Sequence, residues 1–430
     1  MTPTVVTSEL ADPPRSGPWT PRVAIALAVL AASAFVYVTA EIMPVGALPA
    51  IAADLQVSEA TVGTLLASYA LVAALATVPL VRWTADWPRR RILLFTLVSL
   101  IVSQVLSAIA PTFTVLALGR VLCALTHGLM WSVIAPIGVR LVPPTHAARA
   151  TAAVYAGTGL ALVVGSPLTT AMSALWGWRA AVAGIAAAAA AVLVAARFTV
   201  PLMAKAQLIT GADADPQACR PSWHHRNRLL VAMCVLTLVG VTGHFVSYTF
   251  IAVIIRDIVG VHGPHLAWML AAYGIAGLAA MALMARPGDR RPRAAIIGCL
   301  AALSLIFAVL AALGYGALGG RITAATLVIG IVAIVSWGAA ATAMPPILQS
   351  AAMRYSPADP DGASGLYVAA FQVGIMAGSL LGGVLYERAG EPEMLTASAL
   401  LVAGALACVL VSRDLLADSG VAVVEVVSEK

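Results

Sequence analysis

The sequence has little charge. Only 10% of its 430 residues are Asp, Glu, Lys or Arg, whereas 61% are hydrophobic, and soluble domains carry about a quarter charged residues. This balance excludes an ordinary soluble enzyme or binding domain and indicates a membrane protein. Lysine is nearly absent: Lys205 and Lys430 are the whole set. Neither follows a glycine, so the chain has no Walker A phosphate-binding loop.

Other signatures are missing as well. The five cysteines are widely spaced and form no CxxC pair, which argues against disulfides and structural zinc. No HExxH zinc motif, GxSxG nucleophile motif or dinucleotide fingerprint occurs. The net charge of +6 comes without a basic, aromatic-interleaved patch. We therefore expect no enzyme activity, no metal, no organic cofactor and no nucleic-acid partner.

Long apolar runs dominate what is present. A helix needs about 20 apolar residues to cross a bilayer, and twelve runs approach or exceed this length without the period-two alternation of barrel strands. The predicted fold class is an all-α membrane protein with twelve transmembrane helices, over 22–53, 58–81, 92–110, 114–140, 148–173, 179–203, 229–255, 265–285, 294–314, 322–350, 363–386 and 394–412.

The basic residues predict the orientation of these helices. With the N-terminus inside the cell, the outside loops hold only Arg179, Arg256, Arg321 and Arg388 of the 25 Lys and Arg residues, and nearly all the others fall inside. This bias follows the positive-inside rule. We expect a multi-pass protein of the inner or plasma membrane, in contact with lipid, with both termini cytoplasmic. Residues 1–21 and 414–430 would be cytoplasmic tails, the first of them disordered.

The chain divides into two halves that resemble each other. A polar linker over 204–228 separates six spans (22–203) from six more (229–413). The segment from Pro144, PTHAARATAAVYAGTGLALVVGSPL, aligns with PADPDGASGLYVAAFQVGIMAGSLL from Pro357 at a constant offset of 213 residues. Two pseudo-symmetric six-helix bundles are therefore predicted.

Ionisable residues inside the spans are rare enough to be informative. Glu41 is the acid that lies well inside an apolar run, and Arg120 is the matching base. A charge at the bilayer centre costs at least ~2.5–3.5 kcal/mol, so each is expected to face a cavity or a partner. Arg120 alternatively snorkels to the surface or caps neighbouring helices. Desolvation favours a protonated carboxylate, which makes Glu41 a candidate proton carrier.

Helical spacing groups further polar residues with these two. Tyr37 and Glu41 share one face of the first span, Arg120, His127 and Trp131 share a face of the fourth, and His244 and Tyr248 share a face of the seventh. With Gln372 they are the candidate substrate-cavity residues. The histidines are alternatively hydrogen-bonded core residues, and Tyr37, Tyr248, Trp131 and Trp337 alternatively serve packing.

Two other features suggest conformational gating. Asp86, in RWTADWPRRR with Arg90, and Asp289, in ARPGDRRPRA, each precede an arginine cluster at equivalent points of the halves. They are either solvated charges or acids that pair with Arg or a helix N-terminus and lock one conformation. Small residues recur every fourth position around Gly165 and Gly378, which indicates close helix packing or a sliding surface between the halves. Pro167 is expected to bend its helix.

These residues and their arrangement resemble the major facilitator superfamily. GRVLCALTHG looks like the superfamily's fourth-helix motif, built on Arg120, and GTGLALVVGSPL looks like the fifth-helix motif of proton-driven antiporters. TAEIMPVGALPAIAADLQVSEATVG, ALTHGLMWSVIA, WGWR and VTGHFVSYTFI are similar to the twelve-span drug-proton antiporters, and especially to their bacterial sugar-efflux branch. Arg82 stands where the loop motif usually has Gly, and Leu168 and Thr169 replace the glycines that end the fifth-helix motif.

The resemblance implies proton-coupled export of a small solute by alternating access, with a sugar as the first expectation. Protons would be the coupling ion, Glu41, Arg120 and His127 would couple them to transport, and a monomer is expected. A multidrug or chloramphenicol-type antiporter, a passive facilitator and a sensor with a transporter fold are the alternatives. Glu41, as the acid in the cavity, is compatible with export of a drug such as a lipophilic cation or an amphenicol. The histidines and tyrosines instead favour a neutral polar solute.

Overall fold

The computed structural model describes residues 19–202, 227–262, 264–318, 323–357, 359–412 and 415–416. Over these residues the chain is helical and has no strand, which confirms the all-α prediction. Most of the predicted linker and most of the two predicted tails lie outside the described residues. Several helices begin at a polar cap, as the local sequence favours. Ser58 accepts from the Thr61 N–H at 3.0 Å, and Asp359 accepts from the Gly362 N–H at 3.0 Å.

The first half contains eight α-helices. They are α1 (Pro21–Gly46), α2 (Leu48–Leu55), α3 (Glu59–Trp83), α4 (Arg89–Ala108), α5 (Phe113–Arg140), α6 (Ala147–Leu160), α7 (Ser166–Trp176) and α8 (Trp178–Thr199). A short 3-10 turn, η1 (Pro144–His146), precedes α6, and a π-helical turn, η2 (Ala161–Gly165), joins α6 to α7. The predicted fifth span thus has a π bulge just before Pro167.

The second half repeats this plan. It consists of α9 (Arg228–Tyr248), α10 (Ile251–Val253), the π turn η4 (Ile254–Val259), α11 (Pro264–Arg290), α12 (Pro292–Leu318), α13 (Ala324–Arg354), α14 (Pro360–Arg388) and α15 (Glu391–Val411). Eleven helices of the described residues are long and apolar enough to cross a membrane. Helix α3 has 25 residues, and its apolar stretch Ser68–Trp83 is shorter than these eleven.

Three predicted spans are not single α-helices, one of them being the fifth, which the π turn η2 interrupts. The span predicted over 22–53 is wrong, because α1 ends at Gly46 and α2 is a separate helix. Pro44 removes a backbone donor near the end of α1, and Pro49 occupies a favoured position in the first turn of α2. The span predicted over 229–255 likewise stops at Tyr248 and continues as η4.

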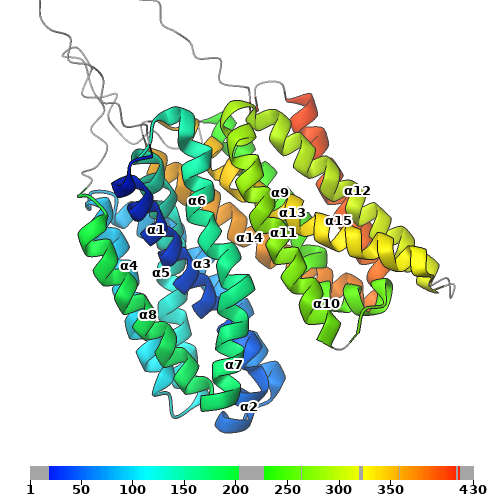
Figure 1. Cartoon of the computed structure of the whole chain (residues 1–430), viewed down its shortest axis with the longest axis horizontal. Coiled ribbons are helices and arrows are strands. Elements are labelled where there is room, and N and C mark those ends of the chain that lie inside the picture. The colour runs from blue at the N-terminus through cyan, green and yellow to red at the C-terminus, as the bar shows by residue number, and fades with distance from the viewer. Residues whose placement is uncertain are drawn as a thin grey trace, which may run out of the picture.

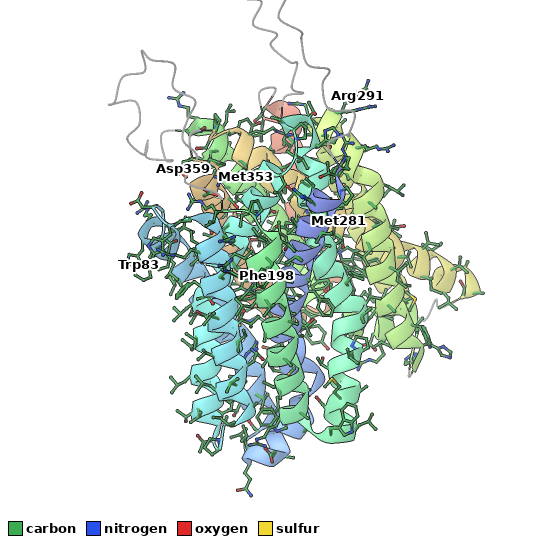
Figure 2. The ribbon with its side chains drawn as sticks, turned by 60° about the vertical axis from the view of Figure 1, so that its left-hand side comes forward. Trp83, Phe198, Met281, Arg291, Met353 and Asp359 are labelled. Atoms are coloured by element: carbon green, nitrogen blue, oxygen red, sulfur yellow. The ribbon has the colours of Figure 1, made fainter. Side chains whose placement is uncertain are left out.

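The two halves are joined along equivalent helix pairs. Helix α3 packs against α14, and α6 packs against α11. The bundles lie close together at the end where α1 begins and diverge toward the opposite end (Figure 1). We call the first of these the basic end, because arginine-rich turns such as 89–91 and 290–293 lie there. Figure 2 shows Arg291, Met353 and Asp359 together at this end.

Candidate functional site

Glu41 and His127 face each other in the first half. Glu41 lies on α1, three residues before Pro44, and its side chain is 21% exposed. His127 lies on α5 and is buried, with its Nε2 atom 4.0 Å from Glu41 Oε2. A carboxylate and an imidazole at this separation interact strongly once one of them changes its charge. The structure thus brings together two of the residues singled out from the sequence.

Tyr69, on α3, completes this pair and was missed by sequence reasoning. Its hydroxyl lies 2.9 Å from His127 Nδ1 and 3.4 Å from Cys123 Sγ. The Tyr69 and His127 rings meet edge to face with centroids 5.3 Å apart. A lone tyrosine in an apolar run has no polar neighbour at helical spacing, so no pattern indicated it. Tyr69 orients the His127 ring toward Glu41.

Arg120 binds the backbone of α1 at its break. Its two terminal nitrogens donate to the Ala40 carbonyl at 2.5 Å and to the Glu41 carbonyl at 2.8 Å. Pro44 has no N–H, so the Ala40 carbonyl, four residues earlier, has lost its usual helical donor. The guanidinium also lies over the Tyr69 ring, 4.9 Å from its centroid. Arg120 is therefore a buried cap rather than a snorkelling residue, and it places a positive charge beside Glu41.

Tyr37 does not line a cavity. The residue is fully buried, and its hydroxyl donates to the Thr96 carbonyl at 2.6 Å and lies 3.1 Å from Thr126 Oγ1. These bonds join α1 to α4 and α5, and only the ring edge approaches His127, at 6.1 Å between centroids. The expectation of a cavity-lining Tyr37 is corrected, because its polar group is already satisfied within the bundle.

Trp131 lies where the halves meet. Its ring packs against Tyr155 of α6 at 4.8 Å, and its carbonyl accepts from Gln349 Nε2 of α13 at 3.2 Å. The hydroxyls of Tyr155 and of Tyr367, on α14, also lie near each other across the halves. Gln349 and Tyr367 were not indicated by the sequence, since only the folded chain brings α13 and α14 to this point. This layer thus links the two halves by a ring contact and a hydrogen bond.

The second half contains a cluster of aromatic side chains around His244. Trp337 Nε1 donates to His244 Nδ1 at 3.0 Å, and the His244 and Tyr248 rings stack with centroids 5.0 Å apart. Tyr273 of α11 lies 5.7 Å from Tyr248 and 5.9 Å from Trp337. The His244–Tyr248 pair therefore does share a face, as its spacing predicts. Gln372, on α14, is 3% exposed, and its Oε1 atom has no hydrogen-bond partner among the described residues.

Ion pairs hold the two halves together at the basic end. Asp361 of α14 accepts from Arg89 of α4 at 2.5 Å and from Arg140 of α5 at 2.8 Å. Asp289 of α11 accepts from the Ala148 N–H, in the first turn of α6, at 2.6 Å and from Arg149 Nε at 2.6 Å. Asp289 thus contacts both an arginine and a helix N-terminus, the two partners considered from the sequence. We call these two clusters the Asp361 latch and the Asp289 latch.

The latches are not exact copies. Asp361 is the counterpart of Ala148 at the offset of 213 residues, so here the acid lies in the first turn of the helix and the bases lie on the other half. Asp86, the counterpart of Asp289, is exposed in the turn after α3. Arg90 donates to the Val200 carbonyl of its own half at 3.3 Å. Arg90 therefore binds within its own half, whereas its neighbour Arg89 pairs with Asp361 across the halves.

The small-residue stripes pack within each half. A Cβ atom on Gly165 would overlap the Thr39 side chain of α1, and one on Gly378 would lie 2.6 Å from the Thr242 carbonyl of α9. Both glycines therefore allow close packing against a helix of their own bundle. The hypothesis of a sliding surface between the halves is wrong for these two residues. Pro167 is exposed and directly follows the π turn η2.

Comparisons with known proteins agree with this architecture. Residues 30–261 and 233–417 match the family model of the Major Facilitator Superfamily. A chloramphenicol efflux pump of Mycobacterium tuberculosis is 61% identical over 398 residues, which cover 93% of this chain and 94% of the pump. A probable sugar efflux transporter of Mannheimia succiniciproducens is 28% identical over 362 residues, covering 84% and 87% of the two chains. The crystal structure of the human organic anion transporter MFSD10 superimposes with a TM-score of 0.68 at 17% identity, over 91% of this chain and 100% of the other.

Proposed function

Because this chain belongs to the Major Facilitator Superfamily, we propose that it is a proton-coupled exporter of a small drug-like solute of the chloramphenicol type. The relative that is 61% identical is a chloramphenicol efflux pump, whereas the sugar efflux relative is 28% identical. Similarity of this order favours the drug alternative over the sugar export first expected from the sequence. Export of arabinose-like sugars is the second candidate.

The observation that carries proton coupling is the Glu41–His127 pair. Among the described residues, Glu41 and His127 are a carboxylate and an imidazole that face each other inside apolar helices. The Glu41 carboxylate is partly exposed, so it can exchange a proton. Loss of a proton from Glu41 leaves a negative charge that Arg120 and a protonated His127, its neighbours among the described residues, can offset. The protonation state of the pair thus changes the free energy of the site by an amount that depends on the geometry of α1.

Coupling follows if that geometry differs between conformations. Arg120 holds α1 at the carbonyls of Ala40 and Glu41, so movement of α1 relative to α5 moves Glu41 relative to a fixed positive charge. Solute and proton then compete through the conformational equilibrium, and each shifts the affinity for the other by the same factor. A sensor or a passive facilitator has no need of this arrangement.

Alternating access uses the latches at the basic end. In the present arrangement the Asp361 and Asp289 latches close this end, while the halves diverge at the other (Figure 1). With the basic end cytoplasmic, as the arginine distribution predicts, this arrangement opens outward. Breaking both latches would let the halves rock to the inward-open state around the central residues. One chain suffices for this cycle, so a monomer remains the expectation.

Solute export from intact cells tests the substrate class. Cells expressing the chain are expected to accumulate less labelled chloramphenicol than cells expressing Glu41→Gln, and arabinose or a thiogalactoside should not compete. Glu387→Gln is the matched control, because Glu387 is exposed near the end of α14. Export of labelled arabinose or thiogalactoside, with chloramphenicol accumulation equal in cells with and without the chain, would replace the drug with a sugar. Equal export by the parent and Glu41→Gln would support a facilitator, and binding without any flux would support a sensor.

A further inference from the structure

The aromatic cluster of the second half fixes one histidine as a hydrogen-bond donor. Trp337 Nε1 carries a hydrogen and no acceptor lone pair, so its contact with His244 Nδ1 makes Nδ1 the acceptor. A neutral imidazole has one N–H, which must then be on Nε2. Trp337 is fully buried and packs against Phe307 at 4.9 Å. This donor therefore holds the His244 ring in one tautomer and one orientation.

Two polar atoms of this cluster have no partner among the described residues. Among the described residues, neither His244 Nε2 nor the Tyr248 hydroxyl has a hydrogen-bond partner, and both side chains are only partly buried. An unsatisfied donor at membrane depth is costly unless water or a ligand reaches it. Phe245 and Tyr273 add ring surface beside them, at 5.3 Å and 5.7 Å from Tyr248. The cluster thus combines aromatic surface with oriented donors.

We propose that this cluster is the solute-binding surface of the second half, and that His244 Nε2 donates a hydrogen bond to an acceptor oxygen of a neutral aromatic solute. The solute ring packs against the His244, Phe245 and Tyr248 rings, and Trp337 is a positioning residue that keeps the donor on Nε2. The inference rests on the proposed export of a chloramphenicol-type drug, which is an aromatic molecule with several acceptor oxygens.

The geometry also separates this surface from the proton site. Glu41, His127 and Arg120 are on α1 and α5 of the first half, whereas the cluster is formed by α9, α11 and α13. Changes in the cluster should therefore alter the affinity for solute and leave the number of protons exchanged per solute unchanged. A residue with only a structural role would lower expression or thermal stability instead of this affinity.

Binding of chloramphenicol to the purified full chain, measured by calorimetry in detergent, tests the proposal. Removing one neutral hydrogen bond weakens binding about three- to tenfold, so we expect this loss in His244→Leu and in Trp337→Phe. His244→Gln retains an N–H donor near the Nε2 position and should stay within about twofold of the parent on the same reasoning. Trp268→Phe is the matched control, because Trp268 is 74% exposed.

Each result decides the matter. Unchanged binding in His244→Leu, or equal losses in His244→Leu and His244→Gln, would overturn the role of the donor. Unchanged binding in Trp337→Phe would overturn its positioning role. Proteoliposome transport gives a second readout, in which KM rises in His244→Leu while the protons moved per solute stay constant. If the parent chain itself fails to bind chloramphenicol, the proposed function falls instead, so the two failures are distinguishable.

Discussion

The Asp361 latch gives the clearest quantitative prediction. Asp361 is 3% exposed and accepts hydrogen bonds from Arg89, which is 4% exposed, and from Arg140. Asp361→Asn keeps the size of the side chain and removes its charge, so two arginines on the other half lose their counter-ion. We expect this substitution to destabilise the arrangement that is closed at the basic end, and to leave the folding of each half intact.

The size of the effect follows from burial. Removing one partner of a buried ion pair costs ~3–5 kcal/mol. Arg140 is 20% exposed, and Arg89 becomes hydrated when the halves separate. We therefore expect a cost at the lower end of this range. A change of ~3 kcal/mol alters the ratio of the two conformations by roughly 100-fold. A chain that is mostly closed at the basic end would then become mostly open there.

Distances between spin labels measure this shift. Cysteines at Phe198 of the first half and Arg291 of the second, both exposed, would carry the labels on a background that lacks the native cysteines (Figure 2). The distance distribution of Asp361→Asn should move toward longer distances. Asp257→Asn is the control, because Asp257 pairs with its neighbour Arg256 and contacts no latch. An unchanged distribution in Asp361→Asn would refute the reasoning that these ion pairs hold the halves together.

Three further predictions concern stability, measured by thermal unfolding in detergent. Gly382→Ala should destabilise by about 1–3 kcal/mol, because its Cβ overlaps the Val246 carbonyl of α9, whereas Gly383→Ala meets nothing within 4 Å and should be neutral or stabilising. Arg120→Lys retains the charge but lacks the planar fork that binds the two carbonyls and covers the Tyr69 ring. A loss of about 1.5–3 kcal/mol is expected, and an unchanged melting temperature would contradict its capping role. The Arg179 hydrogen bond lowers the pKa of Asp54, so the stability it contributes is present above about pH 4 and is lost as the pH falls through the folded-state pKa. Asp54→Asn should remove this pH dependence at a cost of at most about 1 kcal/mol, since the pair is exposed. If the melting temperatures of the parent and the variant fall equally as the pH is lowered, the prediction is wrong.

The helical architecture is predictable from the sequence because a bilayer demands long apolar segments. The breaks within helices are harder to predict. Pro44 lies two residues before the end of α1, and the apolar run continues unbroken into α2, so hydropathy alone cannot separate the two. Glu41 and His127 were found because charged and titratable groups are conspicuous in apolar runs.

The partners of these residues could not be predicted in the same way. Tyr69 reaches His127 from α3, and Asp361 reaches Arg89 from residues far along the chain. Such contacts depend on how helices of two bundles are packed, and the periodicity of one helix carries no information about its neighbours. Tyr37 shows the converse error, because a shared helix face with Glu41 does not decide which neighbour that face meets.

Solute-driven proton movement tests the central claim, which is that Glu41 couples proton transfer to export. Proteoliposomes containing the parent chain, with a pH-sensitive dye inside, would receive chloramphenicol on one side and would be compared with Glu41→Gln and the exposed control Glu387→Gln. The account predicts a proton signal in the parent and in Glu387→Gln, and none in Glu41→Gln. Chloramphenicol flux of equal size in all three proteins, without a proton signal in any of them, would contradict it.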